Sequence, residues 1–331
     1  MNYLLKRVAG AVPLLLLLSV ISFTLIQLPS GDFSDQIRSQ AMSQGGLSAV
    51  EADAVAQDFR VRHGLDQSGA VQYLKWIKGI LLEGDFGYSF SQNRDIADLV
   101  GERLPITLLI AGISHVLATL IGAGLGIYSA TRQYSWADNL AGLVSFIGMT
   151  TPRFIMALVL MYWMVFSLGI ADVSSLYSAE FILLPWSFAK FIDMLTHIWP
   201  ILLIAVFGGM AYNLRVMRSN MLDVLQAQYI ETARAKGLAH HKVILKHALP
   251  NAMHPLIMYQ GVALPYMIAG EIEVAIVFAL PTVGPLIISS MNNQDVFVVS
   301  TFLMLLATTL VVGNIIADAL LVLVDPRLRH A

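Results

Sequence analysis

The sequence predicts an all-α polytopic membrane protein with six transmembrane helices. Hydrophobic residues make up 57% of the 331-residue chain and charged residues only 13%, and the mean hydropathy is +0.70. Soluble globular proteins carry about a quarter charged residues, so this chain has roughly half the usual share. Apolar runs of about 20 residues, the length that crosses the hydrocarbon core, recur along it. Lipid is therefore the expected solvent for most of the chain.

Composition also argues against several classes of function. The formal net charge is −2 and the pI is about 6.4, which gives no support for nucleic-acid binding. The chain contains no cysteine, which excludes disulfides, thiolate metal sites and thiol nucleophiles. There is no HEXXH motif, and the adjacent His240 and His241 would point in different directions on a helix. We therefore expect no catalytic and no metal site.

The first predicted span covers residues 8–28 and follows Lys6 and Arg7. This run is longer and less interrupted than the apolar core of a signal peptide, and no small-residue cleavage site follows it. Residues 1–28 are therefore expected to form an uncleaved anchor with its N-terminus in the cytoplasm.

Residues 29–105 differ in kind and are predicted to form a water-facing, periplasmic helical insert. They hold 11 of the 22 acidic residues and 7 of the 20 Lys and Arg residues. Amphipathic runs at residues 48–63 and 71–82 indicate short helices. The alternative is a disordered loop, but the insert has apolar side chains that a folded structure would bury: Tyr73, Trp76, Ile77, Ile80, Leu81 and Leu82.

Five further spans are expected in residues 106–331, the predicted transmembrane core. They cover residues 106–129, 146–170, 198–214, 256–278 and 296–324. A straight helix over residues 139–170 would be about 48 Å long, too much for one crossing. Because Pro152 interrupts helical hydrogen bonding, we expect a shallow helix before it and the span after it.

Positive charges in the short loops predict the orientation. Lys and Arg residues gather on the side of the N-terminus, near Arg132, in residues 215–255 and at the C-terminus, whereas the opposite short loops contain only Lys190. Long loops such as the insert are largely exempt from this rule. Both termini are therefore expected in the cytoplasm, and the insert on the outer side.

Residues 215–255 are too long for a tight connection and predict two helices. Gly237 stands where a helix C-cap is expected, and a second helix fits residues 240–247, ending before Pro250. Two helices joined at a Gly bend would form a knob that fits a groove on a partner protein. The alternative, equally compatible with these residues, is an amphipathic hairpin on the lipid headgroups. Apolar residues at helical spacing would form one face of the first helix: Leu222, Leu225, Tyr229 and Ala233.

A motif in this segment resembles the EAA loop of ABC-importer permeases, E-[AT]-A-x-x-x-G. The run reads Glu231-Thr232-Ala233-Arg234-Ala235-Lys236-Gly237, and Leu249-Pro250 stands where that signature ends in Leu-Pro, although His247 replaces its usual Ile. In that family the loop forms the coupling helix that docks into a cleft of the ATPase subunit. The resemblance implies that Glu231 and Gly237 shape the knob and that Arg234 and Lys236 form its charged rim. The residues so assigned to ATPase coupling are Leu225, Tyr229, Glu231, Thr232, Ala233, Arg234, Lys236 and Gly237.

Further motifs resemble the oligopeptide and dipeptide branch of these permeases and run from residue 29 to residue 329. The first is Pro29-Ser30-Gly31-Asp32, in which Ser30 splits the branch's usual Pro-Gly-Asp. The others are Gly64-Leu65-Asp66-Gln67, Gly84-Asp85-Phe86-Gly87-Tyr88-Ser89, Glu102-Arg103-Leu104-Pro105, Phe278-Ala279-Leu280-Pro281-Thr282-Val283-Gly284 and Asp325-Pro326-Arg327-Leu328-Arg329. Two positions depart from the branch: Ala275 stands where Glu is common, and Pro285 where Arg is common. These departures fall near the expected outer mouth of the path, so the substrate stays open between peptides and oligosaccharides.

The resemblance implies a transport role and a set of partners. The expected assembly in the bacterial inner membrane pairs this chain with a second permease subunit, two ATP-binding subunits and a periplasmic solute-binding protein. The chain has no G-x-x-x-x-G-K-[ST] loop, so we expect no cofactor in it, with ATP and Mg bound by the partner ATPase. Alternating access would then move a peptide-like solute. A passive channel or membrane scaffold without ATP coupling is the alternative from a different class.

Polar groups at membrane depth mark further candidates. Glu271 and Glu273, late in the fifth span, would share a face on a strand or loop but diverge by about 200° on a helix. They form either an acidic lining of the substrate path or a pair at the headgroup level. Asn314 and Asp318, four residues apart, are expected to link helices. His115 is expected to pack within the second span.

Small residues and prolines predict the shape of two spans. Gly122 and Gly126, with Gly124 between them, form a G-x-x-x-G pattern that allows close helix approach but is common in membrane spans. Pro255 and Pro265 in the fifth span free backbone groups and permit a bend, which serves either gating or shape alone.

Overall fold

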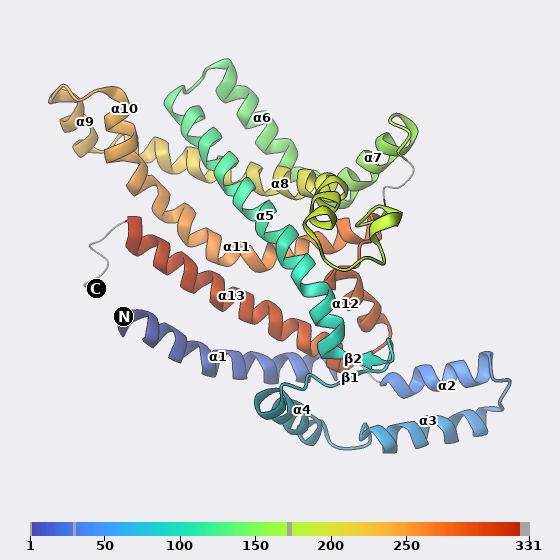
Figure 1. The fold of residues 1–331 in the computed structure, drawn as a ribbon. Helices are drawn as coiled ribbons and strands as arrows, with labels where there is room; N and C mark the ends of the chain where they lie inside the picture. Colours follow the sequence, from blue (N-terminus) through green and yellow to red (C-terminus); the bar gives the residue numbers. More distant parts are fainter. Residues whose placement is uncertain (1, 29–30, 171–173, 325–331) are drawn as a thin grey trace. The chain divides into compact units, whose positions relative to one another are not determined.

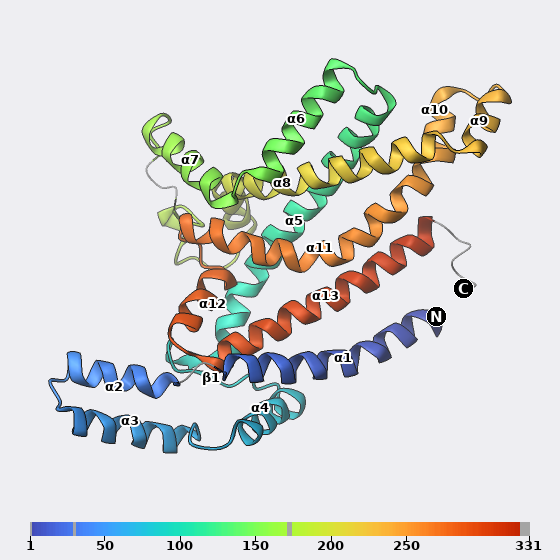
Figure 2. The same cartoon turned by 180° about the vertical axis from the view of Figure 1, so that it is seen from behind.

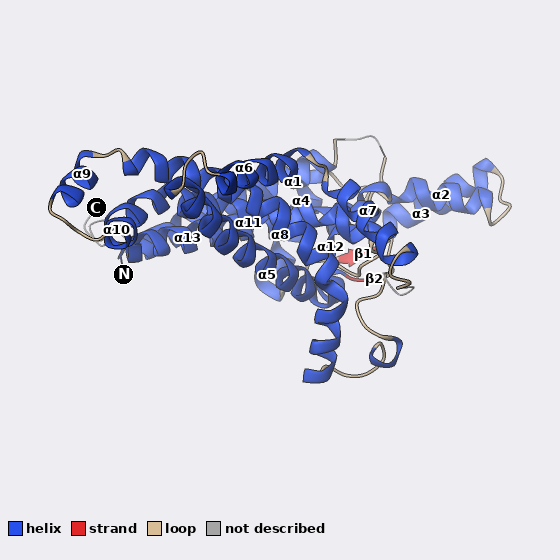
Figure 3. Cartoon of the chain, turned by 90° about the horizontal axis from the view of Figure 1, so that it is seen from above, coloured by secondary structure: helices blue, strands red, loops and turns tan. Residues whose placement is uncertain are grey.

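A computed structural model describes residues 2–28, 31–170 and 174–324, and these are almost entirely helical (Figures 1 and 3). The elements are α1 (Asn2–Ile26), α2 (Phe33–Ser43), α3 (Ala49–His63), α4 (Gly69–Glu83), β1 (Tyr88–Ser89), β2 (Arg94–Asp95), α5 (Ile96–Thr131), α6 (Trp136–Thr150), α7 (Arg153–Phe166), the 3-10 turn η1 (Ala179–Phe181), α8 (Phe188–Leu225), α9 (Gln228–Ala235), α10 (His240–Lys242), the π-helix η2 (Val243–Ala248), α11 (Leu249–Val277), α12 (Val283–Asn292) and α13 (Val296–Val324). The motif residues Pro29, Ser30 and 325–329 lie outside the described residues.

The chain divides into two compact units, so that α5, α12 and α13 each contribute to both. Unit 1 comprises Met1–Pro105 and Pro285–Thr308, and unit 2 comprises Ile106–Gly284 and Thr309–Ala331. Unit 1 thus contains the predicted insert, and unit 2 contains the EAA-like motif.

Several helices are suited to a membrane. Within the described residues, three are long and apolar enough to cross one, namely α5, α8 and α13. Two bent pairs raise that number to five: α6 with α7, and His240–Tyr266 with Glu271–Val277. Gly10–Ile26 in α1 is a shorter apolar helix. The protein is therefore an all-α polytopic membrane protein, and the number of six spans stays a prediction.

In unit 1, both amphipathic runs of the insert are helical, as predicted. The first is α3, which begins with a capping box: the Ser48 hydroxyl accepts from the Glu51 backbone N–H, and the Glu51 carboxylate accepts from the Ser48 backbone N–H at 2.9 Å. Hydrogen bonds from the Ser48 hydroxyl and N–H lower the pKa of the Glu51 carboxyl. The second is α4. Figure 2 shows α2 and α3 lying side by side. The ring centroids of Phe33 on α2 and Phe59 on α3 are 5.8 Å apart.

Aromatic packing explains why the insert is folded rather than disordered. Trp76 of α4 is buried, stacks on Phe23 of α1 at 5.5 Å between ring centroids, and donates its indole N–H to the Phe86 carbonyl at 3.1 Å. The expectation that Leu81 and Leu82 are buried is wrong, since both are exposed. At 100° per residue they stand about 120–140° around α4 from Trp76, away from the packed face.

A buried carboxylate joins the insert to residues 285–308 of unit 1. The Asp295 carboxylate accepts from the Ser89 hydroxyl at 2.7 Å, the Ser91 hydroxyl at 2.9 Å and the Ser91 backbone N–H at 3.1 Å. Ser89 belongs to β1, which pairs antiparallel with β2 in a short hairpin, drawn in red in Figure 3. Three donors on one oxygen stabilise a charge that burial alone would disfavour.

In unit 2, α5 packs closely against α8 through the G-x-x-x-G pattern. A Cβ at Gly122 would lie 2.6 Å from the Asn213 Cβ, and one at Gly126 would lie 2.8 Å from the Leu214 carbonyl oxygen. Gly124, between them, faces open space. Helices α5 and α8 therefore approach each other closely at Gly122 and Gly126, where a side chain on α5 would clash with α8.

The predicted break at Pro152 is confirmed. Helix α6 ends at Thr150, α7 begins at Arg153, and the two helices are bent by 101°. Pro152 lies at the start of α7, where its missing N–H removes no intrahelical bond. On α6, the Ser145 hydroxyl donates to the Ala211 carbonyl of α8 at 2.7 Å.

Two helix boundaries in residues 215–255 differ from the prediction. Helix α8 continues to Leu225 and the chain turns before α9, so Leu222 and Leu225 do not share one helix face with Tyr229 and Ala233. The predicted end before Pro250 is also wrong, because Leu249 is helical and η2 leads directly into α11. A π-turn bonds each N–H to the carbonyl five residues back, and this wider turn relieves the clash that a proline ring makes in an α-helix.

Candidate functional site

The EAA-like motif lies on α9 and the turn after it, where α8 ends and α11 begins (Figures 1 and 2). One face of α9 is buried: Ile230 is fully enclosed, and Ala233 is 6% exposed. They pack in one apolar cluster whose other buried members are Ala130, Met217, Met221, Val243, Ala248, Ala252 and Leu256. The cluster fixes α9 to the ends of α8 and α11, so α9 is a rigid projection and not a loose loop.

The other face of α9 is free of partners within the described residues. Glu231, Arg234 and Lys236 are exposed and make no ion pair there. Tyr229 is 45% exposed, and the exposed Thr232 donates its hydroxyl to the Gln228 carbonyl within the same helix. The side chains point to solvent as an apolar ring flanked by two cations and one acid, which is a surface suited to a partner groove.

Gly237 ends α9 in a left-handed conformation. Its φ is +74°, and its N–H donates to the Arg234 carbonyl at 2.9 Å, with the Leu238 N–H donating to the Ala233 carbonyl. A Cβ here would meet no heavy atom within 4 Å, so the requirement for glycine is conformational and not steric.

The residues assigned to coupling therefore separate into two groups. Leu225, half-buried, and Ala233, buried, belong to the apolar cluster beneath α9, which the sequence pattern did not distinguish from the outer face. The remaining six are exposed, and they form the outer surface of α9 and its C-terminal turn: Tyr229, Glu231, Thr232, Arg234, Lys236 and Gly237.

An ion pair that the sequence did not suggest lies between α6 and α8. The Asp138 carboxylate is 4% exposed and is held by Arg218 through two bonds, from Nε at 2.7 Å and from Nη2 at 2.8 Å. The Ser129 hydroxyl donates to the same carboxylate, as does the Tyr134 backbone N–H at 2.8 Å. The bidentate contact fixes the α5–α6 turn to α8 about two turns before α8 ends.

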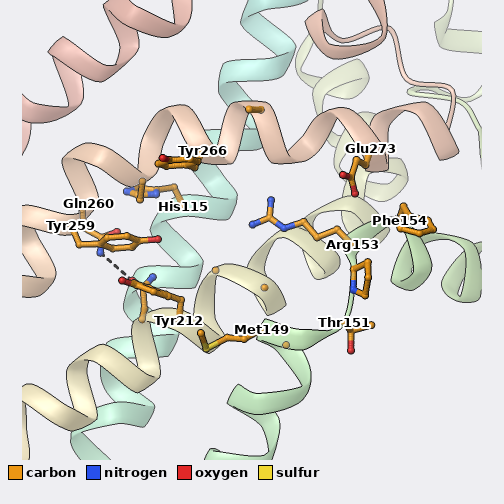
Figure 4. A pocket seen from close by; sticks show the side chains of 17 residues that line it. His115, Met149, Thr151, Arg153, Phe154, Tyr212, Tyr259, Gln260, Tyr266 and Glu273 are labelled. Atoms are coloured by element: carbon orange, nitrogen blue, oxygen red, sulfur yellow. Dashed lines mark hydrogen bonds between the residues drawn. The ribbon is translucent and has the colours of Figure 1, made fainter. Parts of the chain in front are cut away.

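The second candidate site is a cavity of about 650 Å³ within unit 2 (Figure 4). Helices α5, α8 and α11 and the break between α6 and α7 line it. Its polar lining side chains are His115, Thr151, Arg153, Tyr212, Asn213, Tyr259, Gln260, Tyr266 and Glu273. A cavity of this size is in the range that holds small ligands.

Amide and hydroxyl groups join three helices at one end of the cavity. Thr119 donates its hydroxyl to the Gln260 side-chain oxygen at 2.8 Å, and the Gln260 side-chain amide donates to the Asn213 side-chain oxygen at 3.1 Å, the dashed line in Figure 4. Asn213 donates in turn to Thr119 at 3.4 Å. The Tyr212 and Tyr259 rings contact each other beside this network, with centroids 4.3 Å apart and planes tilted by 31°. The network links α5, α8 and α11 through partners that are 47 to 141 residues apart in sequence.

The two acids of the fifth span stand on different faces, because α11 is helical there. Glu273 is exposed and lines the cavity, whereas Glu271 is 5% exposed and does not line it. Ala275, where the resembling branch has Glu, is buried in the apolar core with Val274 and Phe278. Of the two acids, only Glu273 lines the cavity.

Arg153 was not among the site residues predicted from the sequence. Figure 4 shows its guanidinium reaching from the start of α7 across the cavity. Its Nη1 is buried and donates to no acceptor among the described residues. The signal that could have found it is its isolation, since it is the only Lys or Arg between Arg132 and Lys190.

His115 and Asn314 were also predicted from the sequence, as packing residues within the spans. His115 lines the cavity and is half-buried. Asn314 lies against Gly261 of α11, where an added Cβ would be 2.8 Å from the Asn314 side-chain oxygen, so it does mark a helix contact as expected. Among the described residues, no group of three or more acidic or His side chains is arranged to hold a metal ion.

Comparisons with known proteins cover nearly the whole chain. Residues 122–330 match the family "Binding-protein-dependent transport system inner membrane component", and residues 1–111 match "Binding-prot-dependent transport system membrane comp, N-term". The chain is 34% identical over 332 residues to the oligopeptide transport system permease protein AppB of Bacillus subtilis, covering 99% of both chains. It is 32% identical to the glutathione transport system permease protein GsiC of Salmonella typhimurium, over 100% of this chain and 99% of that one. A putative peptide permease protein of Brucella ovis is 31% identical, over 99% of both chains.

Proposed function

This chain belongs to the binding-protein-dependent transport system inner membrane component family, and from that membership we propose that it forms the translocation path of an ABC importer for a peptide-like solute. The proposed assembly holds a second permease subunit, two ATP-binding subunits that carry ATP and Mg, and a solute-binding protein on the outer side. Both termini and α9 face the cytoplasm, and the insert faces the periplasm.

The observation that carries the proposal is that one continuous helix serves both candidate sites. Tyr212 and Asn213 of α8 line the cavity, and the same helix ends at Leu225 beneath α9. The 13 residues from Tyr212 to Leu225 span about 20 Å at 1.5 Å per residue. Because α9 is packed rigidly onto α8, a displacement of α9 by a partner ATPase moves the cavity lining as well. This coupling is what alternating access requires.

A peptide-like solute is supported by the cavity and by the relatives. The permeases named above are described as carriers of oligopeptides and glutathione, and the cavity offers a cation, an acid and tyrosine hydroxyls. These groups complement a carboxylate, an ammonium and peptide amides. The aromatic rings of Tyr212 and Tyr259 also suit the face of a sugar, so an oligosaccharide is the second candidate.

The role of α9 is tested by Gly237→Asp in the complex co-expressed from the neighbouring genes. An aspartate at φ +74° destabilises the turn and adds a negative charge to the outer surface of α9. We expect ATP-driven uptake to fall by about tenfold or more, with membrane insertion intact, since a strain of about 1–2 kcal/mol at the docking turn is enough for that loss.

Gly46→Asp is the matched control. Gly46 also has a positive φ, of +63°, and open space around its Cβ, but it lies between α2 and α3 in unit 1. It should leave the ATPase activity of the complex unchanged. Normal uptake by Gly237→Asp, or the absence of any associated ATPase, would contradict ATP coupling and favour a passive channel or scaffold.

A further inference from the structure

We propose that Arg153 binds the carboxylate of the transported solute, so that the cavity selects solutes with a free carboxyl group, such as peptides with an unblocked C-terminus. This inference rests on the proposed function and specifies its substrate class. Arg153 would act by contact with the solute, in the cavity drawn in Figure 4.

The first argument is the unmet hydrogen bonding of Arg153. A guanidinium is always charged and carries five N–H donors. Nη1 of Arg153 is buried and has no acceptor, and the side chain makes no ion pair within the described part of the chain. An ionic group at membrane depth that lacks a partner in the protein is expected to find one in a pathway or ligand.

The second argument is that the bend between α6 and α7 places the Arg153 side chain at the cavity. The 101° bend after α6 places Arg153 at the first position of α7, beside the cavity. Its guanidinium lies over Gly208 of α8, where an added Cβ would be 3.3 Å from Nε and 3.7 Å from Nη2. A glycine at that point leaves room for the guanidinium beside α8, where a larger residue would crowd it.

The third argument concerns the other charges of the site. Arg153 is the only Lys or Arg that lines the cavity, and neither Glu271 nor Glu273 forms an ion pair with it among the described residues. Glu271 is buried, with Oε1 lacking a hydrogen-bond partner. Neither carboxyl group is thus bonded to the guanidinium, and a planar guanidinium recognises a carboxylate through two parallel bonds.

The remaining lining suits the rest of a short peptide. The Tyr212 and Tyr259 hydroxyls line the cavity and offer neutral donors and acceptors for amide groups, beside the Asn213 and Gln260 side chains, which are bonded to each other. The exposed Glu273 lines the cavity as well and can accept from an ammonium group. A peptide C-terminus therefore matches Arg153 better than a neutral sugar does, because a sugar leaves the cation unpaired.

The test is uptake by the whole complex, with its solute-binding protein, in proteoliposomes. The probe is a defined mixture of tripeptides, each present as the free acid and as the C-terminal amide, with lumenal contents measured by mass spectrometry. The affinity of the solute-binding protein for each form is measured separately, so that its own preference is divided out. Variants Arg153→Gln, Arg153→Lys and Gly208→Ala are compared with the control Arg132→Gln, which removes an exposed arginine on α5–α6 that does not line the cavity.

For Arg153→Gln we expect uptake of free acids to fall by about tenfold, while uptake of amides stays within about twofold of wild type. Arg153→Lys should keep part of the acid preference, since it retains the charge but loses the bidentate contact. Gly208→Ala should weaken that preference less than Arg153→Gln does, because it only displaces the guanidinium. Arg132→Gln should change nothing.

An equal loss for acids and amides would overturn the inference and leave Arg153 a structural or gating residue, and an unchanged acid preference would overturn it as well. These results differ from a failure of the proposed function, in which the wild-type complex imports no tripeptide of either form.

Discussion

At the scale of single residues, Asp138 shows how one carboxylate fixes several backbone segments. It receives donors from the end of α5, the following turn and α8, and it is almost fully buried, whereas the Arg218 side chain is 30% exposed. Removing the acid leaves a largely enclosed guanidinium without its counterion, which is more costly than losing an exposed pair.

We therefore predict that Asp138→Ala lowers the free energy of unfolding by about 2 kcal/mol, less than for a fully buried pair because Arg218 reaches solvent. The measurement is thermal unfolding of the purified complex in detergent. Asp58→Ala is the control, because Asp58 pairs with Arg62 on an exposed face of α3, and it should shift stability by less than about 0.5 kcal/mol. Equal shifts in the two variants would show that the buried pair contributes no more to stability than the exposed pair does.

At the scale of elements, the contact between α5 and α8 depends on the absence of side chains. Gly122 and Gly126 are buried against α8, and the nearest atoms to an added Cβ at Gly126 include backbone of α8, which cannot rotate away. Helices that approach this closely gain van der Waals contact, the main source of helix association in a membrane.

Gly126→Ala is expected to separate the two helices and to destabilise unit 2 by about 1–3 kcal/mol, the usual result of overpacking. Gly124→Ala, two residues away and facing open space, should leave the unfolding midpoint unchanged and serves as the matched control. Uptake should fall together with stability for Gly126→Ala only. A fall of the midpoint in Gly124→Ala alone would mean that α5 presents its other face to a helix neighbour.

Sequence patterns predicted the elements whose causes are local. The amphipathic pattern of residues 48–63 and 71–82 predicted the two helices there, and Pro152 predicted the bend between α6 and α7. At Pro250 the same reasoning failed, because the penalty for proline assumes an α-helical turn and the chain adopts a π-turn instead.

The candidate site was less predictable, for a physical reason. The EAA-like motif is contiguous, so the exposed residues of α9 could be named in advance. The cavity is formed by residues far apart in sequence, and nothing near Thr119 indicates Asn213 or Gln260 as its partners. In the sequence Arg153 is distinguished only as an isolated charge. Its position beside the cavity depends on the bend between α6 and α7.

At the scale of the whole molecule, the orientation in the membrane follows from loop charges and stays a prediction. The absence of cysteine makes it directly measurable, because one introduced thiol is the only thiol in the chain. Val50 in the insert is 80% exposed, and Lys236 after α9 is exposed.

We predict that Val50→Cys reacts with a membrane-impermeant maleimide in intact spheroplasts, and that Lys236→Cys reacts only in inverted vesicles or after permeabilisation. The unmodified chain, lacking thiols, gives the background. Labelling of both variants from the same side would place α9 and the insert in one compartment and would contradict the proposed docking to a cytoplasmic ATPase.

The continuity of α8 has a quantitative consequence for how far the partner must move. Consider α8 as a lever that pivots near Tyr212, with an arm of about 20 Å to Leu225. A tilt of about 10° about that pivot carries the tip, with α9 attached, through about 3.5 Å. The reverse also holds: a nucleotide-dependent displacement of a few ångströms at α9 rotates the cavity wall by an angle comparable to a gating motion, with no need for the helix to bend or unwind.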